Sequence, residues 1–133
     1  MKMKLVAGVF GAALLGSMTA WGHHAFSAEF DVNKPINFRG TLTQVEFVNP
    51  HSWFHVDVKG ADGKTQSWMI EAGTPNVLFR RGITKRSIPI GTEIVVDGFQ
   101  AKDGSLKGSG RDLTLPDGRK LLIGSGEADA PKK

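Results

Sequence analysis

Hydrophobic and polar side chains alternate along residues 52–59. A period of two is typical of a strand with one buried face. The pattern therefore predicts a strand here, with Phe54, Val56 and Val58 facing inward and Trp53, His55 and Asp57 facing outward.

Other short runs of β-forming residues also predict strands, and turn residues separate them. Residues 40–48 begin with a glycine that favours a bend, and the phase change between Leu42 and Val45 predicts a bulge. The run ends at Asn49-Pro50, because proline offers no backbone donor to a sheet. The glycine-rich residues 104–110 are expected to form a hairpin loop. The predicted strands are residues 40–48, 52–59, 65–71, 93–100 and 110–115, with a short closing segment at 119–123.

One segment predicts a helix instead. Thr74 suits the N-cap, Pro75 suits the first helical position, and Gly82 suits the stop. The resulting order is three strands, one helix and two strands. This order predicts a mainly β fold, a small five-stranded OB-like barrel with one short helix between strands three and four. An open β-sandwich of the same strands is the alternative.

The N-terminus has the pattern of a secretory leader. Lys2 and Lys4 precede an apolar run at residues 5–16, which is about half the length of a membrane-spanning helix. Ala20 and Gly22 are the small residues that signal peptidase prefers, so cleavage after Gly22 is expected. We therefore predict a periplasmic or secreted protein without a membrane anchor. Its predicted divisions are residues 1–22 (signal peptide), 23–38 (N-terminal arm), 39–124 (OB-like domain) and 125–133 (disordered tail).

Charge argues against one class of partner. The chain carries 17 basic and 13 acidic residues, but Lys2 and Lys4 lie in the leader. Its removal leaves 15 basic and 13 acidic side chains, a net charge of +2. Nucleic-acid binding relies on a dense basic footprint, so the sequence does not favour it.

Several stretches together resemble a known family. They are "HHAFSAEFD", "GTLTQVEFVNPHSWFHVDV", "GTPNVLFRRG", "EIVVDGFQAKDGS" and "LPDGRKLL". In these stretches the chain resembles the secreted bacterial family catalogued as domain of unknown function 6152. The resemblance implies an exported, single-domain, β-rich protein, and it implies no particular activity. It also implies that the paired histidines after the leader and the Asn-Pro-His turn, here ending at His51, are family features.

All four histidines lie at two places, His23-His24 and His51 to His55. There is no cysteine, so imidazole is the main candidate for binding a transition metal. If His23 becomes the first residue, its free amine and its ring can chelate one copper ion together, and a second imidazole would complete a three-nitrogen site.

On a straight strand His51 and His55 would stand about 13 Å apart, too far to share an ion. We expect His51, in the turn, to be the partner of His23, with His24 or His55 assisting and Asp57 or Glu71 orienting a ring. The alternative interpretation is that the histidines are ordinary polar residues that bind no metal.

A metal-independent binding module is the alternative function. Trp53, Trp68, Glu71, Arg80 and Arg81 would then bind a small anionic or aromatic ligand, or a protein partner, with the two tryptophans exposed for stacking. The simpler interpretation of the arginines is that they stabilise the end of the helix.

Catalysis has weaker support than binding. The sequence lacks a Gly-x-Ser-x-Gly nucleophile motif, and Glu71 has no evident partner carboxylate. The sequence therefore favours a binding protein over an enzyme.

Overall fold

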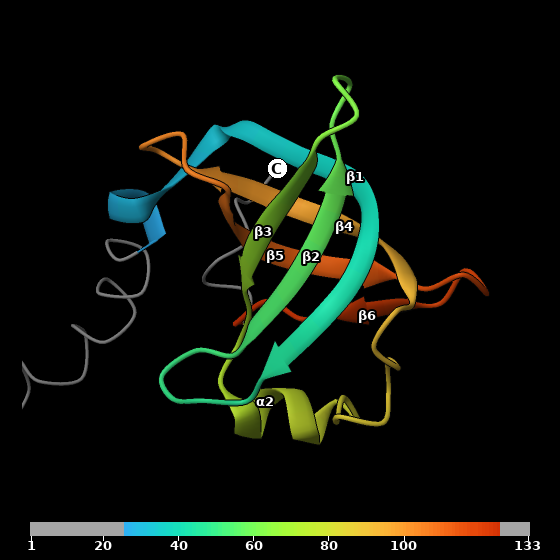
Figure 1. Ribbon diagram of the computed structural model, residues 1–133. Helices are drawn as coiled ribbons and strands as arrows, with labels where there is room; N and C mark the ends of the chain where they lie inside the picture. Colours follow the sequence, from blue (N-terminus) through green and yellow to red (C-terminus); the bar gives the residue numbers. More distant parts are fainter. Residues whose placement is uncertain (1–25, 126–133) are drawn as a thin grey trace, which may run out of the picture.

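The computed structural model describes residues 26–125 of the protein, which form one antiparallel β-sheet and a short helix (Figure 1). The predicted leader, His23, His24 and residues 126–133 lie outside this range. In the described part of the chain, no helix is long and apolar enough to cross a membrane. The elements are β1 (Phe30–Glu46), β2 (Trp53–Lys59), β3 (Thr65–Glu71), α2 (Pro75–Arg80), β4 (Glu93–Ala101), β5 (Lys107–Thr114) and β6 (Lys120–Leu122).

The sheet has the strand order β3-β2-β1-β4-β5-β6. An additional parallel pairing joins β3 to β5, so that five strands form a ring and β6 extends it beside β5. In Figure 1, β1 curves strongly around the ring between its two neighbours. The mainly β fold and the helix between β3 and β4 are confirmed.

β1 is much longer than the sequence predicts, since it begins at Phe30 rather than near Gly40. Residues 30–41 pair with β4 and residues 41–46 pair with β2, with the expected bulge between Leu42 and Gln44 inside the second pairing. A Cβ atom on Gly40 would lie 2.6 Å from the carbonyl oxygen of Asp57. Glycine is therefore needed where β1 passes closely over β2 and changes partners.

The core lies inside the ring and follows the alternation of the strands. Phe54 and Val56 of β2 are buried, whereas Trp53, His55 and Asp57 are only partly covered, as predicted. The buried cluster draws on every strand of the ring, the helix and the loops: Ile36, Leu42, Phe54, Val56, Trp68, Ile70, Ala72, Leu78, Ile83, Ile88, Ile94, Val96, Leu113, Leu115 and Ile123.

α2 is confirmed with the caps that the sequence predicts. The Val77 N–H donates to Thr74 Oγ1 at 3.3 Å, Pro75 occupies the first turn, and Gly82 has a positive φ of 78°. Leu78 is fully buried, so it fastens the helix to the core. Figure 1 shows α2 at one end of the ring, opposite the β2–β3 hairpin.

The expected hairpin loop over residues 104–110 is shorter than predicted: residues 104–106 lie in the β4–β5 connection, but β5 begins at Lys107. A Cβ atom on Gly108 would lie 2.6 Å from Ile36 Cδ1, and one on Gly110 would lie 2.5 Å from Ile123 Cδ1. Gly108 and Gly110 therefore serve close packing between strand and core rather than a turn.

Candidate functional site

His51 lies in the connection between β1 and β2, directly after the cis Asn49–Pro50 peptide bond. Its Nδ1 donates to the carbonyl oxygen of Ala72 at 3.2 Å and lies 3.4 Å from Glu71 Oε1. A carbonyl oxygen can only accept, so this contact makes Nδ1 the donor, and in the neutral tautomer with this donor the lone pair is on Nε2. Glu71 and Ala72 thus fix the orientation of the ring through Nδ1, as carbonyl and carboxylate groups do for metal-binding histidines.

His55 is held differently. It lies on the outward side of β2, where its Nε2 is 2.7 Å from Glu46 Oε2 on the neighbouring strand β1. The ring atom that would bind a metal most readily is therefore paired with a carboxylate.

The two histidines belong to separate pairs, His51 with Glu71 and His55 with Glu46. Within residues 26–125, no three side chains of the types His, Cys, Asp and Glu are grouped so that they could hold a metal ion. Asp57, the other expected orienting carboxylate, instead accepts a hydrogen bond from Ser67 at 2.8 Å. Of the two carboxylates named from the sequence, only Glu71 lies beside a histidine.

A row of outward-facing residues crosses the ring next to His51. Trp53 pairs with Glu71, Glu71 pairs with Ser109, and Ser109 pairs with Phe99. Residues opposite each other in neighbouring strands project to the same face of a sheet. Phe26, the first described residue, packs edge-on against Phe99 with ring centroids 6.0 Å apart. The start of the described chain and His51 therefore share one outer surface.

Polar contacts fasten the N-terminal turn to the same surface. Glu29 accepts a hydrogen bond from the Lys102 N–H through its carbonyl oxygen, and its carboxylate forms an ion pair with Lys107. That ion pair raises the pKa of Lys107, and the nearby charge of Glu71 raises it further. Glu29 is a residue that the sequence did not indicate, because a pairing across 78 positions leaves no local signal.

The aromatic and cationic candidates do not gather at one place. Trp68 was expected to be exposed, but it is 7% exposed and packs against Phe38 inside the ring. It shares the inward phase of β3 with Ile70, so the expectation of an exposed Trp68 was wrong. Trp53 is half-buried on the outer row.

The two arginines make backbone contacts. Arg81 donates from Nη1 to the carbonyl oxygens of Leu122 and Gly124, at 3.0 and 2.7 Å. Arg80 donates from Nε to the carbonyl oxygen of Asn76 at 3.3 Å, within α2. Arg81 therefore ties the segment after β6 to the helix end.

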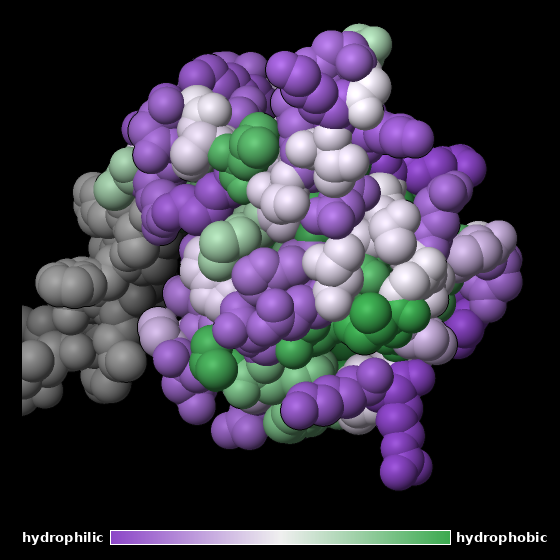
Figure 2. Space-filling view, in the orientation of Figure 1, coloured by the Kyte–Doolittle hydropathy of each residue, from purple (hydrophilic) through white to green (hydrophobic). Residues whose placement is uncertain are grey.

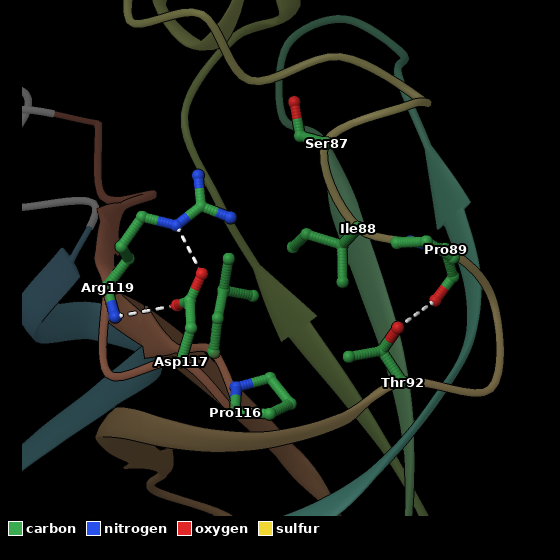
Figure 3. Close-up of a pocket in the computed structure, with 8 residues that line it drawn as sticks. Ser87, Ile88, Pro89, Thr92, Pro116, Asp117 and Arg119 are labelled. Atoms are coloured by element: carbon green, nitrogen blue, oxygen red, sulfur yellow. Dashed lines mark hydrogen bonds and ion pairs between the residues drawn. The ribbon is translucent and has the colours of Figure 1, made fainter.

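A cavity of about 210 Å³ lies elsewhere, between the segment that precedes β4 and the β5–β6 turn (Figure 3). Its polar side chains already have partners. Arg119 pairs with Asp117 at 2.6 Å and lowers the pKa of that carboxyl group, and Thr92 donates to the Pro89 carbonyl oxygen. None of the residues named from the sequence lines this cavity, which offers no unpaired reactive group.

The fold and its outer row define a small β protein with a carboxylate-oriented histidine on its surface. Residues 12–111 match the model of the Family of unknown function (DUF6152), and the chain belongs to that family. This confirms the resemblance noted from the sequence. A search of curated proteins found no match to the chain.

Proposed function

We propose that the protein is an exported binding module that holds copper through the amine and ring of His23 and the Nε2 atom of His51. The observation that carries the proposal is the contact of His51 Nδ1 with Ala72 and Glu71. Metal-binding histidines typically donate their second ring nitrogen to a carbonyl or carboxylate in this way. Three nitrogen ligands in a tetragonal arrangement suit copper(II) best among the divalent first-row ions.

The outer row supports the pairing of His23 with His51. Glu71 and Phe99 are separated by two strand spacings, about 10 Å. Phe26 contacts Phe99, and the three residues from Phe26 back to His23 can span up to about 11 Å. These lengths are of the same order, which supports the proposal that His23 can approach the side of the ring where Glu71 contacts His51. In this proposal His24 is the assisting imidazole, because His55 is already paired with Glu46.

The proposal also covers the compartment in which the protein works and the type of β fold that it adopts. Cleavage of the leader after Gly22 would create the free amine of His23, and it would release the protein into the periplasm or the medium. We also propose that the ring of strands is an OB-like barrel. The support is the parallel β3–β5 pairing that joins the two halves, together with the single helix between β3 and β4.

The test combines mass spectrometry with copper titration. The exported protein should begin at His23, and it should bind one copper(II) ion with an electron paramagnetic resonance spectrum typical of nitrogen ligands. His51→Ala should weaken copper binding by at least about tenfold, since one of three ligands is removed.

Two matched variants complete the test. His55→Ala removes the other described histidine and should leave copper affinity within about twofold. A protein extended by one alanine before His23 should bind as weakly as the His51→Ala protein, because the chelating amine moves away from the ring. An N-terminus other than His23, or unchanged affinity after His51→Ala, would disprove the proposal.

A further inference from the structure

The segment from α2 to the start of β4 carries an unusual charge distribution. Residues 72–92 contain Arg80, Arg81, Lys85 and Arg86 and no acidic residue. Among the described residues, the ion pairs of the protein involve none of these four cations. Four uncompensated positive charges thus lie on a segment of a protein whose predicted mature form has a net charge of only +2.

Packing holds these cations on the outside. Leu78, Ile83 and Ile88 of the same segment are buried and fix it against the core. Arg80, Lys85 and Arg86 are exposed between these anchors. Their positive charges are therefore presented on a rigid support rather than on a loose tail.

The same end of the ring carries exposed apolar side chains, one of which, Phe79, directly precedes Arg80. Phe79 of α2 and Val48 of the β1–β2 connection are each 47% exposed. Phe47 connects them, because its ring centroid lies 5.1 Å from that of Phe79. Figure 2 shows a hydrophobic band over the end of β1 and above α2, with hydrophilic residues along its lower edge. We call Phe47, Val48, Phe79, Arg80, Lys85 and Arg86 the α2 face.

We propose that the α2 face docks the protein peripherally on an anionic lipid bilayer. Phe79 and Val48 enter the boundary between headgroups and acyl chains, while Arg80, Lys85 and Arg86 lie at the level of the lipid phosphates. Exposed aromatic and aliphatic side chains bordered by unpaired cations complement such a surface in both polarity and charge. This inference does not depend on copper binding.

The composition of the face favours a membrane over a protein partner. A stable protein interface covers about 800 Å² on each partner and is depleted of lysine at its centre. The α2 face has only two half-exposed apolar side chains, and Arg80 directly follows one of them, Phe79, in the chain. A bilayer needs only shallow insertion, and it supplies negative charge at every position around the inserted residues.

Vesicle binding tests the proposal with the full mature chain. The protein is mixed with vesicles of equal parts phosphatidylglycerol and phosphatidylcholine, or of phosphatidylcholine alone, and the bound fraction is measured by co-sedimentation. We expect binding to the anionic vesicles that weakens as salt is added, because exposed charges are screened. The triple variant Arg80→Glu, Lys85→Glu, Arg86→Glu should lower the partition coefficient by at least about tenfold.

The apolar part of the face needs its own variant. Phe79→Ser with Val48→Ser should also lower binding by about tenfold, without the change in net charge. Leu122→Ser is the matched control, since Leu122 is exposed on β6 and is not part of the α2 face.

A second control has the same net charge as the triple variant of the α2 face. Lys59→Glu, Lys64→Glu, Lys102→Glu changes three exposed lysines, at the end of β2 and in the β2–β3 and β4–β5 connections, and this variant should retain most of the binding. Circular dichroism of every variant establishes that the fold is kept.

Three results would overturn the proposal. They are the absence of binding to phosphatidylglycerol vesicles, equal losses in the α2-face and control variants, and a concentration-dependent dimer that the α2-face substitutions abolish. The last result would show that the face is a protein interface.

Discussion

His51 and Glu71 meet where β2 begins and β3 ends, with Nδ1 of the histidine 3.4 Å from Oε1 of the carboxylate. The contact joins the connection after β1 to the strand that closes the ring against β5. The β2–β3 pairing brings the two residues together, because Glu71 lies opposite Trp53, which follows His51 by two positions.

Replacing Glu71 by glutamine tests what this contact does. The amide keeps the size of the side chain but loses its negative charge, so the ring of His51 becomes a weaker ligand. We expect copper affinity to fall by about tenfold in a competition titration, while the unfolding midpoint changes little. Glu46→Gln, which alters the pair with His55, is the control and should leave copper affinity unchanged. Equal losses in both variants would contradict a specific role for Glu71.

Phe26→Ser tests whether the N-terminal turn matters for the same site. This substitution removes the ring contacts with Phe30 and Phe99. Without them the N-terminal turn would be held less tightly, and the effective concentration of His23 near His51 would fall. Copper affinity should then fall by up to about tenfold. Phe79→Ser is the control, because Phe79 contacts Phe47 instead. An unchanged affinity in the Phe26→Ser protein would separate the turn from the metal site.

The sequence predicted those elements whose signals are local. The alternation of β2 and the caps of α2 depend on residues within a few positions, and both are confirmed. The first part of β1 could not be predicted in this way. Residues 30–39 include Asn33, Lys34 and Pro35, and they become a strand only by pairing with β4 some 60 positions later.

The candidate site, like the fold, could be predicted from the sequence only in part. The sequence named both His51 and Glu71, but their contact depends on the β2–β3 pairing, which brings the two residues together across 20 positions. It did not reveal that Trp68 faces inward, because Met69 and Ile70 follow it directly and lie on opposite faces of a strand, so both faces carry a hydrophobic residue. The packing of Trp68 on Phe38 decides its position.

Gly98→Ala should be among the most destabilising single substitutions in the sheet. A Cβ atom there would lie 2.0 Å from the carbonyl oxygen of Ser109, a backbone atom that cannot move aside without breaking the β4–β5 pairing. We expect a loss of about 3 kcal/mol or more in the free energy of unfolding, measured with urea. Gly104→Ala meets no atom within 4 Å and has a φ of 76°, so only backbone strain of about 1–2 kcal/mol is expected. A smaller loss for Gly98→Ala than for Gly104→Ala would contradict the steric account.

Ser52→Ala should not destabilise the protein, although Ser52 is fully buried. Its hydroxyl group has no hydrogen-bond partner among the described residues, so the side chain is desolvated without compensation. Removing the oxygen should raise the free energy of unfolding by up to about 1 kcal/mol. Ser67→Ala is the comparison, because it removes a surface hydrogen bond to Asp57 and should be close to neutral. A loss above 1 kcal/mol in Ser52→Ala would indicate that a buried water satisfies the hydroxyl group.

The Glu29–Lys107 ion pair predicts how stability depends on alkaline pH. The pair raises the pKa of Lys107 above the ordinary 10.5, so the folded state holds this proton more tightly than the unfolded state does. Its contribution is complete below the ordinary lysine pKa and is lost as the pH rises through the raised value. Both side chains are partly exposed, so we expect no more than about 0.5 kcal/mol.

Urea unfolding of the natural protein and of Glu29→Gln, on both sides of pH 10.5, measures this contribution. The difference between the two proteins should be present at the lower pH and smaller at the higher one. Other lysines titrate equally in both proteins and cancel in this comparison. A difference that grows with pH would have the wrong sign for a stabilising pair at Lys107.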